Sequence, residues 1–288
     1  MKKIPSYYST NLRSPEVSFK EALLKGLAPD GGLYLPDSIP FISTEELESF
    51  SDKEYHEIAF IVLNKILGTE IDKDDLQKLC LEAYNFNVPL ERVYNRNYIM
   101  RLDQGPTASF KDFAARMMSR LMQHFLQLNN QHLTILTATS GDTGSAVASA
   151  FYGLRNINVI ILYPCNEVTL MQRKQMTTIQ ENIKVIAIDG KFDDCQNLVK
   201  KAFMDPSLSQ LSLSSANSIN IGRLLPQSIY YFYAWANLSE GGDDKAVFSV
   251  PSGNFGNLMG GLLARRMGLP VKKFIISTND NNEVPEFL

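Results

Sequence analysis

The sequence has no excess of positive charge. Its 288 residues include 28 Lys and Arg and 31 Asp and Glu, which gives a formal net charge of −3. Because nucleic-acid backbones are held by clustered Lys and Arg, this balance argues against a nucleic-acid partner. The chain also lacks any run near the roughly 18 apolar residues of a membrane-spanning helix. Two lysines follow Met1 without an apolar stretch behind them, so we expect no signal peptide and no membrane span.

Cysteine and histidine are scarce as well. Cys80, Cys165 and Cys195 lie far apart and form no C-x-x-C pair, which favours reduced thiols in a cytoplasmic protein. The three histidines share no metal-ligand spacing, so we expect no metal centre. The rest of the composition, 44% hydrophobic and 20% charged residues, is typical of a soluble globular protein with one large domain or two ordinary ones.

Apolar periodicity divides the chain at about residue 95. Residues 1–95 are expected to form a mainly helical N-terminal domain, because Ile58, Ile61, Val62 and Ile66 recur at helical spacing before Gly68. Helices are predicted at 45–50, 55–67 and 74–84, with a short strand at 33–35.

From residue 96 to 288, short β-branched runs alternate with helical stretches. Strands are predicted at 133–138, 159–163, 184–188, 246–250 and 273–277, and helices at about 110–128, 144–154, 169–181, 193–204, 222–238 and 257–267. This alternation predicts an α/β fold with a parallel sheet that is covered on both faces. The aromatic stretch 230–235 is expected to be a buried helix face.

Lys111 stands where a turn changes into a helix. Ser109 and Asp112 are three residues apart ahead of an apolar periodic stretch, which predicts an N-cap at Ser109 and places Lys111 at the second helical position. A cation is unfavourable near the positive end of a helix, so this position should lower the pKa of the amine and favour a nucleophile. An ordinary solvated lysine on an exposed first turn is the alternative.

A glycine-containing loop follows the predicted strand 133–138 and leads into a helix. It offers hydroxyl groups, backbone N–H groups and a helix N-terminus, which together suit an anion such as a substrate carboxylate. A well-capped turn without a ligand is the alternative. The loop residues are Ser140, Gly141, Asp142, Thr143 and Gly144.

A second loop of the same kind follows the predicted strand 246–250. Its glycines are expected to take positive φ and to let the backbone approach a ligand, and successive N–H groups could bind a phosphate dianion. No Gly-Lys-Ser/Thr follows, and the G-x-G-x-x-G pattern is absent, which argues against a nucleotide. The loop residues are Gly253, Asn254, Phe255, Gly256 and Asn257.

Taken together, these segments resemble the threonine synthases, a family of fold-type-II (tryptophan synthase β-like) pyridoxal-phosphate enzymes. The resemblance spans the whole chain and is carried by residues 22–34, 105–112, 138–144, 215–223, 252–257 and 278–282. It implies a parallel-sheet fold behind a threonine-synthase-type N-terminal domain. It also implies the conversion of O-phospho-L-homoserine and water into L-threonine and phosphate.

The resemblance implies a role for each site residue. Lys111 would hold pyridoxal 5′-phosphate as a Schiff base and act as the catalytic amine. Residues 253–257 would bind the cofactor phosphate, and residues 140–144 would face the substrate carboxylate. The substrate phosphate needs its own site, for which Ser214, Ser215, Asn217, Asn220 and Arg223 are candidates, because a guanidinium binds phosphate well. A structural ion pair is the alternative for Arg223.

Family members continue beyond the residue that corresponds to Leu288, which suggests a truncated chain of low activity. Three alternatives stay open: a catalytically silent homologue that binds a phosphorylated metabolite, another fold-type-II lyase or dehydratase, and a structural fragment that folds only by pairing with a missing segment. The expected partner is a small-molecule substrate, and both a monomer and a homodimer are compatible with the sequence.

Overall fold

The N-terminal region consists mainly of short helices in the computed structural model, which describes residues 5–68, 70–280 and 286. Asn281 and Asn282, part of the resemblance above, lie outside these residues. Two of the elements before residue 84, β1 (Tyr7–Ser9) and α1 (Phe19–Lys25), were not predicted, because each is too short to show a period. The elements are β1 (Tyr7–Ser9), α1 (Phe19–Lys25), β2 (Tyr34–Pro36), α2 (Thr44–Glu48), α3 (Tyr55–Leu67) and α4 (Lys73–Ala83).

The predicted helix 55–67 is α3. Its residues Ile58, Val62 and Ile66 are buried, as the apolar spacing requires. The helix ends at Gly68, whose φ of 59° lies in the left-handed region where a glycine carries little strain.

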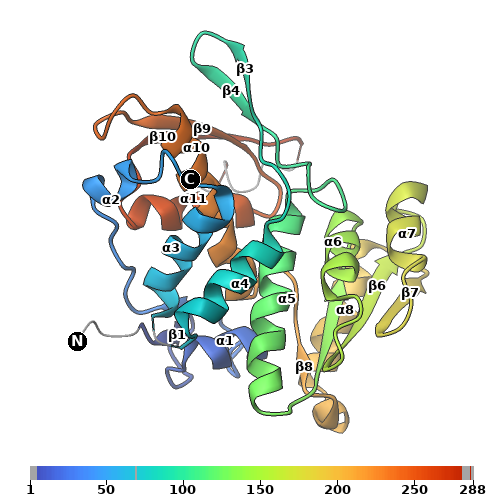
Figure 1. Cartoon of the computed structure of the whole chain (residues 1–288). Coiled ribbons are helices and arrows are strands. Elements are labelled where there is room, and N and C mark those ends of the chain that lie inside the picture. The colour runs from blue at the N-terminus through green and yellow to red at the C-terminus, as the bar shows by residue number, and fades with distance from the viewer. Residues whose placement is uncertain (1–4, 69, 281–285, 287–288) are drawn as a thin grey trace.

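Helix α5 (Lys111–Leu128) stands between the N-terminal helices and the parallel sheet (Figure 1). It contacts α1 and α4 on one side and α6 on the other. Its fully buried Phe113 meets the rings of Tyr55, Tyr84 and Tyr230, so one hydrophobic core joins the two regions of the chain. The predicted domain boundary at about residue 95 stays a prediction. The antiparallel hairpin of β3 (Leu90–Tyr94) and β4 (Asn97–Met100) extends away from this core (Figure 1).

Four parallel strands form the sheet that follows, in the order β7-β6-β5-β8. Alternate residues of β5 serve opposite faces: Ile135 joins the main core, whereas Leu136 packs with Cys195 and Val199 of α8. Helices therefore cover both faces, as predicted. The elements are β5 (Leu133–Ala138), α6 (Asp142–Phe151), β6 (Ile157–Pro164), α7 (Leu170–Thr177), β7 (Ile183–Ile188), α8 (Phe192–Met204) and β8 (Leu213–Ser214).

The C-terminal part departs from the prediction in two ways. Strands β9 (Ala246–Pro251) and β10 (Val271–Ser277) pair with each other in a separate parallel sheet. The predicted helix 222–238 is divided into α9 (Ile221–Leu224), a 3₁₀ turn (Leu225–Ser228) and α10 (Ile229–Leu238), because Pro226 cannot donate an α-helical hydrogen bond. The aromatic face of α10 is buried, as predicted. Helix α11 (Gly256–Arg266) follows β9.

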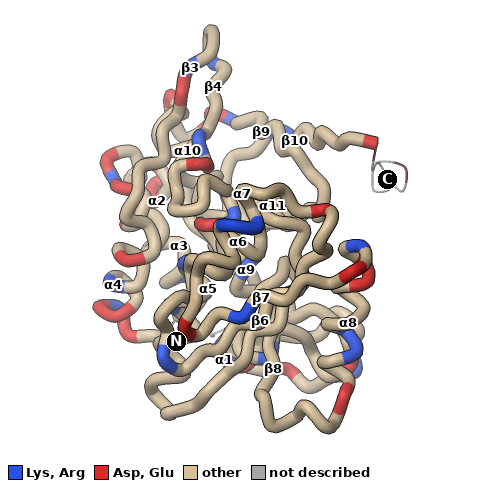
Figure 2. Tube along the Cα trace, turned by 90° about the vertical axis from the view of Figure 1, so that its right-hand side faces the viewer, with Lys and Arg blue, Asp and Glu red and all other residues tan. Residues whose placement is uncertain are grey.

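Charges of both signs are interspersed along the chain (Figure 2). Among the described residues, no helix is long and apolar enough to cross a membrane. All three cysteines are unpaired, and Cys80 and Cys195 are buried.

Candidate active site

Helix α5 starts one residue later than predicted, at Lys111 itself. The assigned N-cap is Phe110 rather than the predicted Ser109, but the Ser109 hydroxyl accepts the N–H of Lys111 (3.3 Å) and its carbonyl accepts the N–H of Asp112 (2.9 Å). The predicted return of the Asp112 side chain to Ser109 is not found among the described residues. Instead, the buried carboxylate of Asp112 accepts hydrogen bonds from the N–H (2.8 Å) and hydroxyl (2.7 Å) of Thr107. Asp112 therefore fixes the turn that presents Lys111.

The Lys111 amine is mostly buried, with 22% of its side chain exposed. Nζ lies 3.4 Å from Oδ2 of Asp142 and 4.5 Å from the ring centroid of Phe110. Burial, with a smaller contribution from the Arg223 charge, lowers the pKa of Lys111, and Asp142 opposes the shift. The shift in the pKa of Lys111 therefore has the predicted direction, but its main cause is desolvation of the amine rather than the positive end of the helix. A lowered pKa favours the neutral form that attacks a carbonyl.

The first glycine loop is held from inside by Thr139, which is only 1% exposed. Its Oγ1 accepts the N–H groups of Gly141 (3.0 Å) and Gly144 (2.8 Å). Within the described part of the chain, the N–H groups of Ser140, Asp142 and Thr143 have no acceptor. They lie at the N-terminus of α6, where an anion is favoured.

Gln172 of α7 holds the same loop from outside. Its Nε2 donates to Oδ1 of Asp142 (2.6 Å), and its Oε1 accepts from the N–H and hydroxyl of Thr169. Gly141 has a φ of 139°, and a Cβ there would lie 2.4 Å from Cδ of Gln172. Only a glycine meets both conditions without strain. The Asp142 side chain faces Gln172 and Lys111, so an anion would meet only its backbone.

The second loop has a different geometry. Positive φ was expected at its glycines, but it occurs at Phe255 (54°), the N-cap of α11. Of the described residues, none provides an acceptor for the N–H groups of the five residues from Gly253 to Asn257. Successive free N–H groups beside a left-handed residue at a helix N-terminus suit a dianion.

Asn257 anchors this loop to α10. Its Oδ1 accepts the hydroxyls of Tyr230 (2.7 Å) and Tyr231 (2.6 Å), and Tyr230 packs against Phe113 of α5. Gly256 lies close to Ser218, Leu224 and Gln227, the last of which donates to the carbonyl of Arg223. The second loop therefore reaches the Lys111 region through α9 and α10.

The segment before α9 has both structural and free polar groups. The amide of Asn220 is fully used: it donates to the carbonyls of Leu23 and Ser215 and accepts from Gly222. These contacts give no support to the substrate-binding prediction for Asn220. They join α1 to the site beside Gly26, whose φ of 76° and close approach to Ser215 require a glycine.

Arg223 is buried, with 4% of the residue exposed. One nitrogen, Nη1, donates to the carbonyl of Ala216, while Nε has no partner among the described residues. Burial lowers the pKa of Arg223 to about 10, and Asp112 opposes the shift. Nearby, the Asn217 side chain accepts from Thr137, and the buried Ser214 hydroxyl has no partner in the described structure. Buried donors without acceptors are candidates for binding an anion.

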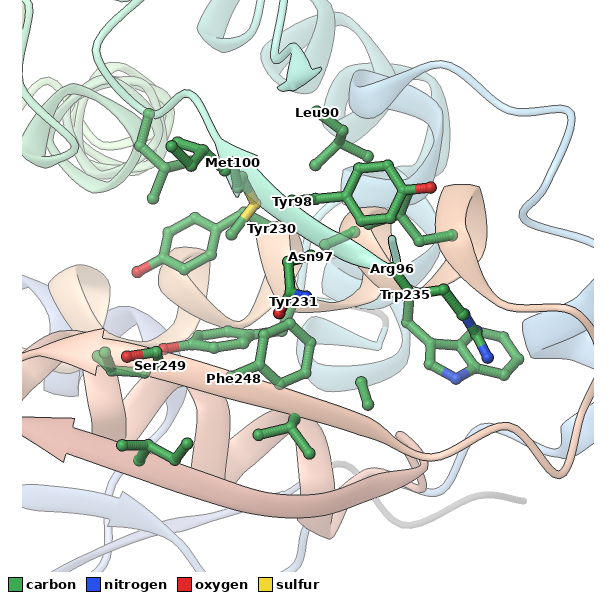
Figure 3. Close-up of a pocket in the computed structure, with 18 of the residues that line it drawn as sticks. Leu90, Arg96, Asn97, Tyr98, Met100, Tyr230, Tyr231, Trp235, Phe248 and Ser249 are labelled. Carbon is green, nitrogen blue, oxygen red and sulfur yellow. The ribbon is translucent and has the colours of Figure 1, made fainter. Parts of the chain in front are cut away.

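A cavity of about 840 Å³ opens between the β3–β4 hairpin, α10 and β9 (Figure 3). Tyr98, Tyr230, Tyr231, Trp235 and Phe248 give it an aromatic lining. Lys111 does not line it. The cavity meets the site only at its edge, through Phe110 and Asn257.

Sequence reasoning missed the residues that support the site. Thr139, Gln172 and Tyr231 hold the loops, but none of them was named as a site residue, although Thr139 lies in the recognised segment 138–144. For Thr139 a signal was available, because it directly precedes Ser140 at the end of a buried strand. Among the described residues, no group of three or more His, Cys, Asp or Glu could hold a metal ion.

Two family profiles match the chain. Residues 6–84 match the threonine synthase N terminus, and residues 84–288 match the pyridoxal-phosphate dependent enzymes. Threonine synthase from Buchnera aphidicola subsp. Schizaphis graminum is 46% identical over 98% of this chain and 66% of its own length. The Escherichia coli K12 enzyme is 44% identical over 98% of this chain and 65% of its own. The chain therefore spans slightly less than two thirds of these relatives.

Solved structures agree. The crystal structure of threonine synthase from Escherichia coli superposes with a TM-score of 0.91 at 42% identity, covering 98% of this chain and 66% of that one. The structure described as pyridoxal-phosphate-bound threonine synthase from Brucella melitensis gives 0.90 at 42% identity, over 96% and 61%. The predicted fold class and the resemblance to threonine synthases are confirmed.

Proposed function

This chain belongs to the pyridoxal-phosphate-dependent enzyme family, and we propose that it is a threonine synthase in which Lys111 binds pyridoxal 5′-phosphate as a Schiff base. The observation that carries the proposal is the mostly buried Lys111 amine beside an N–H-rich loop, with a second such loop reached through α9 and α10. Burial favours the neutral amine, and neutral amines form bonds to aldehydes.

The chain's donors fit the cofactor. The five N–H groups from Gly253 to Asn257, which have no acceptor among the described residues, would bind its phosphate, and Asn257 is held for this by Tyr230 and Tyr231. When bound, pyridoxal phosphate supplies an electron sink for a carbanion at the substrate Cα.

The substrate would be bound by two further groups of donors. The N–H groups of Ser140, Asp142 and Thr143, with Gly141 and Gly144 shaping the turn, would hold the carboxylate. Arg223 Nε, which has no partner in the described part of the chain, would bind the substrate phosphate together with the Asn217 amide. Asn220 would act by holding this segment in place.

The reaction we propose converts O-phospho-L-homoserine and water into L-threonine and phosphate. Once its amine is free, Lys111 would take the proton from the substrate Cα and move protons at Cβ. A proton would be removed from Cβ as phosphate leaves from Cγ, and a proton would be added to Cγ. Water would then add its hydroxyl at Cβ, and a proton would be returned to Cα. The small-molecule substrate and a cytoplasmic location, compatible with the unpaired cysteines, belong to this proposal.

A trapping experiment tests the attachment site. The protein is mixed with pyridoxal phosphate, reduced with borohydride and digested, and the modified peptides are identified by mass spectrometry. We expect the adduct on Lys111 and its loss in Lys111→Ala. The exposed Lys78 is the matched control, because Lys78→Ala should leave the adduct unchanged. An adduct on another lysine, or none with folded protein, contradicts the proposal.

A silent homologue that binds a phosphorylated metabolite is the second candidate. Arg223 Nε and the Ser214 hydroxyl, both without a partner in the described structure, are compatible with anion binding alone. Phosphate release from O-phospho-L-homoserine separates the two: release that disappears in Lys111→Ala supports the enzyme, whereas saturable binding without release supports the silent homologue.

A further inference from the structure

Three helix N-termini are linked by one chain of polar contacts. It begins at Thr169, the N-cap of α7, whose N–H and hydroxyl donate to Oε1 of Gln172. It continues from Nε2 of Gln172 to Asp142, the first residue of α6. It ends at Lys111, the first residue of α5, 3.4 Å from the second Asp142 oxygen.

The amide of Gln172 is fixed on both sides. Its oxygen is occupied by the cap of α7, so its nitrogen must face Asp142. Gly141 packs against the amide so closely that a Cβ would displace it. The Asp142 carboxylate would otherwise be free to rotate, since 48% of its side chain is exposed. The hydrogen bond from Gln172 restricts the rotation of this exposed carboxylate.

We propose that Gln172 is a positioning residue that directs the Asp142 carboxylate onto the Lys111 amine. This inference rests on the proposed function only in taking Lys111 as the reactive amine. The charged groups that face the amine are Asp142 on α6 and Arg223 on α9, and they act in opposite directions. The carboxylate of Asp112, the residue after Lys111, accepts hydrogen bonds from Thr107 instead. The direction of the Asp142 carboxylate therefore adjusts how readily the amine holds a proton, within the larger effect of burial.

Competitive acetylation with acetic anhydride over a pH series measures the pH midpoint of each lysine by mass spectrometry, without any cofactor. The exposed Lys78 is the internal reference. We expect Asp142→Asn to lower the Lys111 midpoint by about one pH unit, because a nearby opposite charge is lost. Gln172→Ala should lower it by a few tenths of a unit, because the carboxylate stays near but loses its direction.

The double variant Asp142→Asn with Gln172→Ala decides the matter, because a residue that acts through Asp142 has nothing to direct when the charge is gone. Its midpoint should equal that of Asp142→Asn. Gln180→Ala is the matched control, since Gln180 is exposed just beyond α7 and its side chain makes no hydrogen bond in the described structure. Its midpoint should match the wild type.

Two results overturn the proposal. The first is a wild-type Lys111 midpoint in folded Gln172→Ala. The second is a shift caused by Gln172→Ala that is the same in the wild-type background and in the Asp142→Asn background. If Gln172→Ala does not fold, the similarly shaped Gln172→Met replaces it under the same criteria. The outcome is independent of the proposed function, since borohydride trapping on Lys111 can fail while the acetylation midpoints still depend on Gln172.

Discussion

The loops after β5 and β9 differ more in structure than in sequence. Each follows a parallel strand, contains two glycines and leads into a helix. Every residue of β5 is buried, however, whereas only Val250 of β9 is. The first loop is held by Thr139 inside and Gln172 outside, while a Cβ on Gly253 would meet no described residue within 4 Å. The comparison indicates that the first loop is preorganised by the protein and the second is open on the side that would receive a ligand.

Removing the hydroxyl group that lies beside each loop, on Thr139 or on Ser252, should give the largest contrast. Thr139→Val keeps the shape but leaves two buried N–H groups without an acceptor, so we expect a loss of about 3 kcal/mol in the free energy of unfolding. Ser252→Ala, which removes a single 3.1 Å bond to Val250, should cost less than about 1 kcal/mol. Urea denaturation followed by circular dichroism measures both. Equal losses would mean that the two loops are supported alike.

Adding a methyl group to one glycine of each loop should give the next contrast. Gly141→Ala forces positive φ on alanine and displaces Gln172, so we expect it to cost about 2 kcal/mol. Gly253→Ala places its methyl group more than 4 Å from any non-adjacent described residue and needs no positive φ, so it should change stability by no more than about 0.5 kcal/mol. Thermal unfolding compares them, and a stable Gly141→Ala protein would disprove the proposed constraint.

Asn257 is the main anchor found for the second loop. Asn257→Ala removes the acceptor that Tyr230 and Tyr231 share, with an expected loss of about 1 kcal/mol. Tyr231 also has the Asn257 carbonyl as an acceptor, which moderates the loss. Urea denaturation of Asn257→Ala beside Tyr231→Phe tests this anchor. If neither variant loses stability, the loop does not depend on α10.

Lys111 should give the smallest change in stability. Because burial lowers its pKa in the folded state, a protonated Lys111 opposes folding below that pKa, and the opposition fades as pH rises toward the ordinary lysine value of about 10.4. Lys111→Met should therefore stabilise the protein at neutral pH and give a smaller gain at high pH. Urea denaturation at both pH values measures this, and a gain that increases with pH would contradict the assigned direction.

Much of the fold follows from the sequence, because it depends on local patterns. The spacing of Ile58, Val62 and Ile66 gave α3 with both ends correct, and the β-branched run 133–138 gave β5 with both ends correct. The short elements β1, α1 and β8 have no period to recognise. Pro226 indicated that the predicted helix 222–238 would be interrupted. The residues on both sides of the proline keep a helical spacing, however, so one continuous helix was predicted.

By itself, the sequence determined which residues could carry the chemistry: an amine at a helix start and two N–H-rich loops. Only the tertiary structure decided how each is held. The burial of Lys111 and the hydrogen bonds from Asn220 to the carbonyls of Leu23 and Ser215 depend on contacts made by the folded chain. The left-handed conformation of Phe255 is a matter of backbone geometry. Local patterns record propensity and charge, but burial and hydrogen-bond partners are properties of the folded chain, because they depend on what packs against each group.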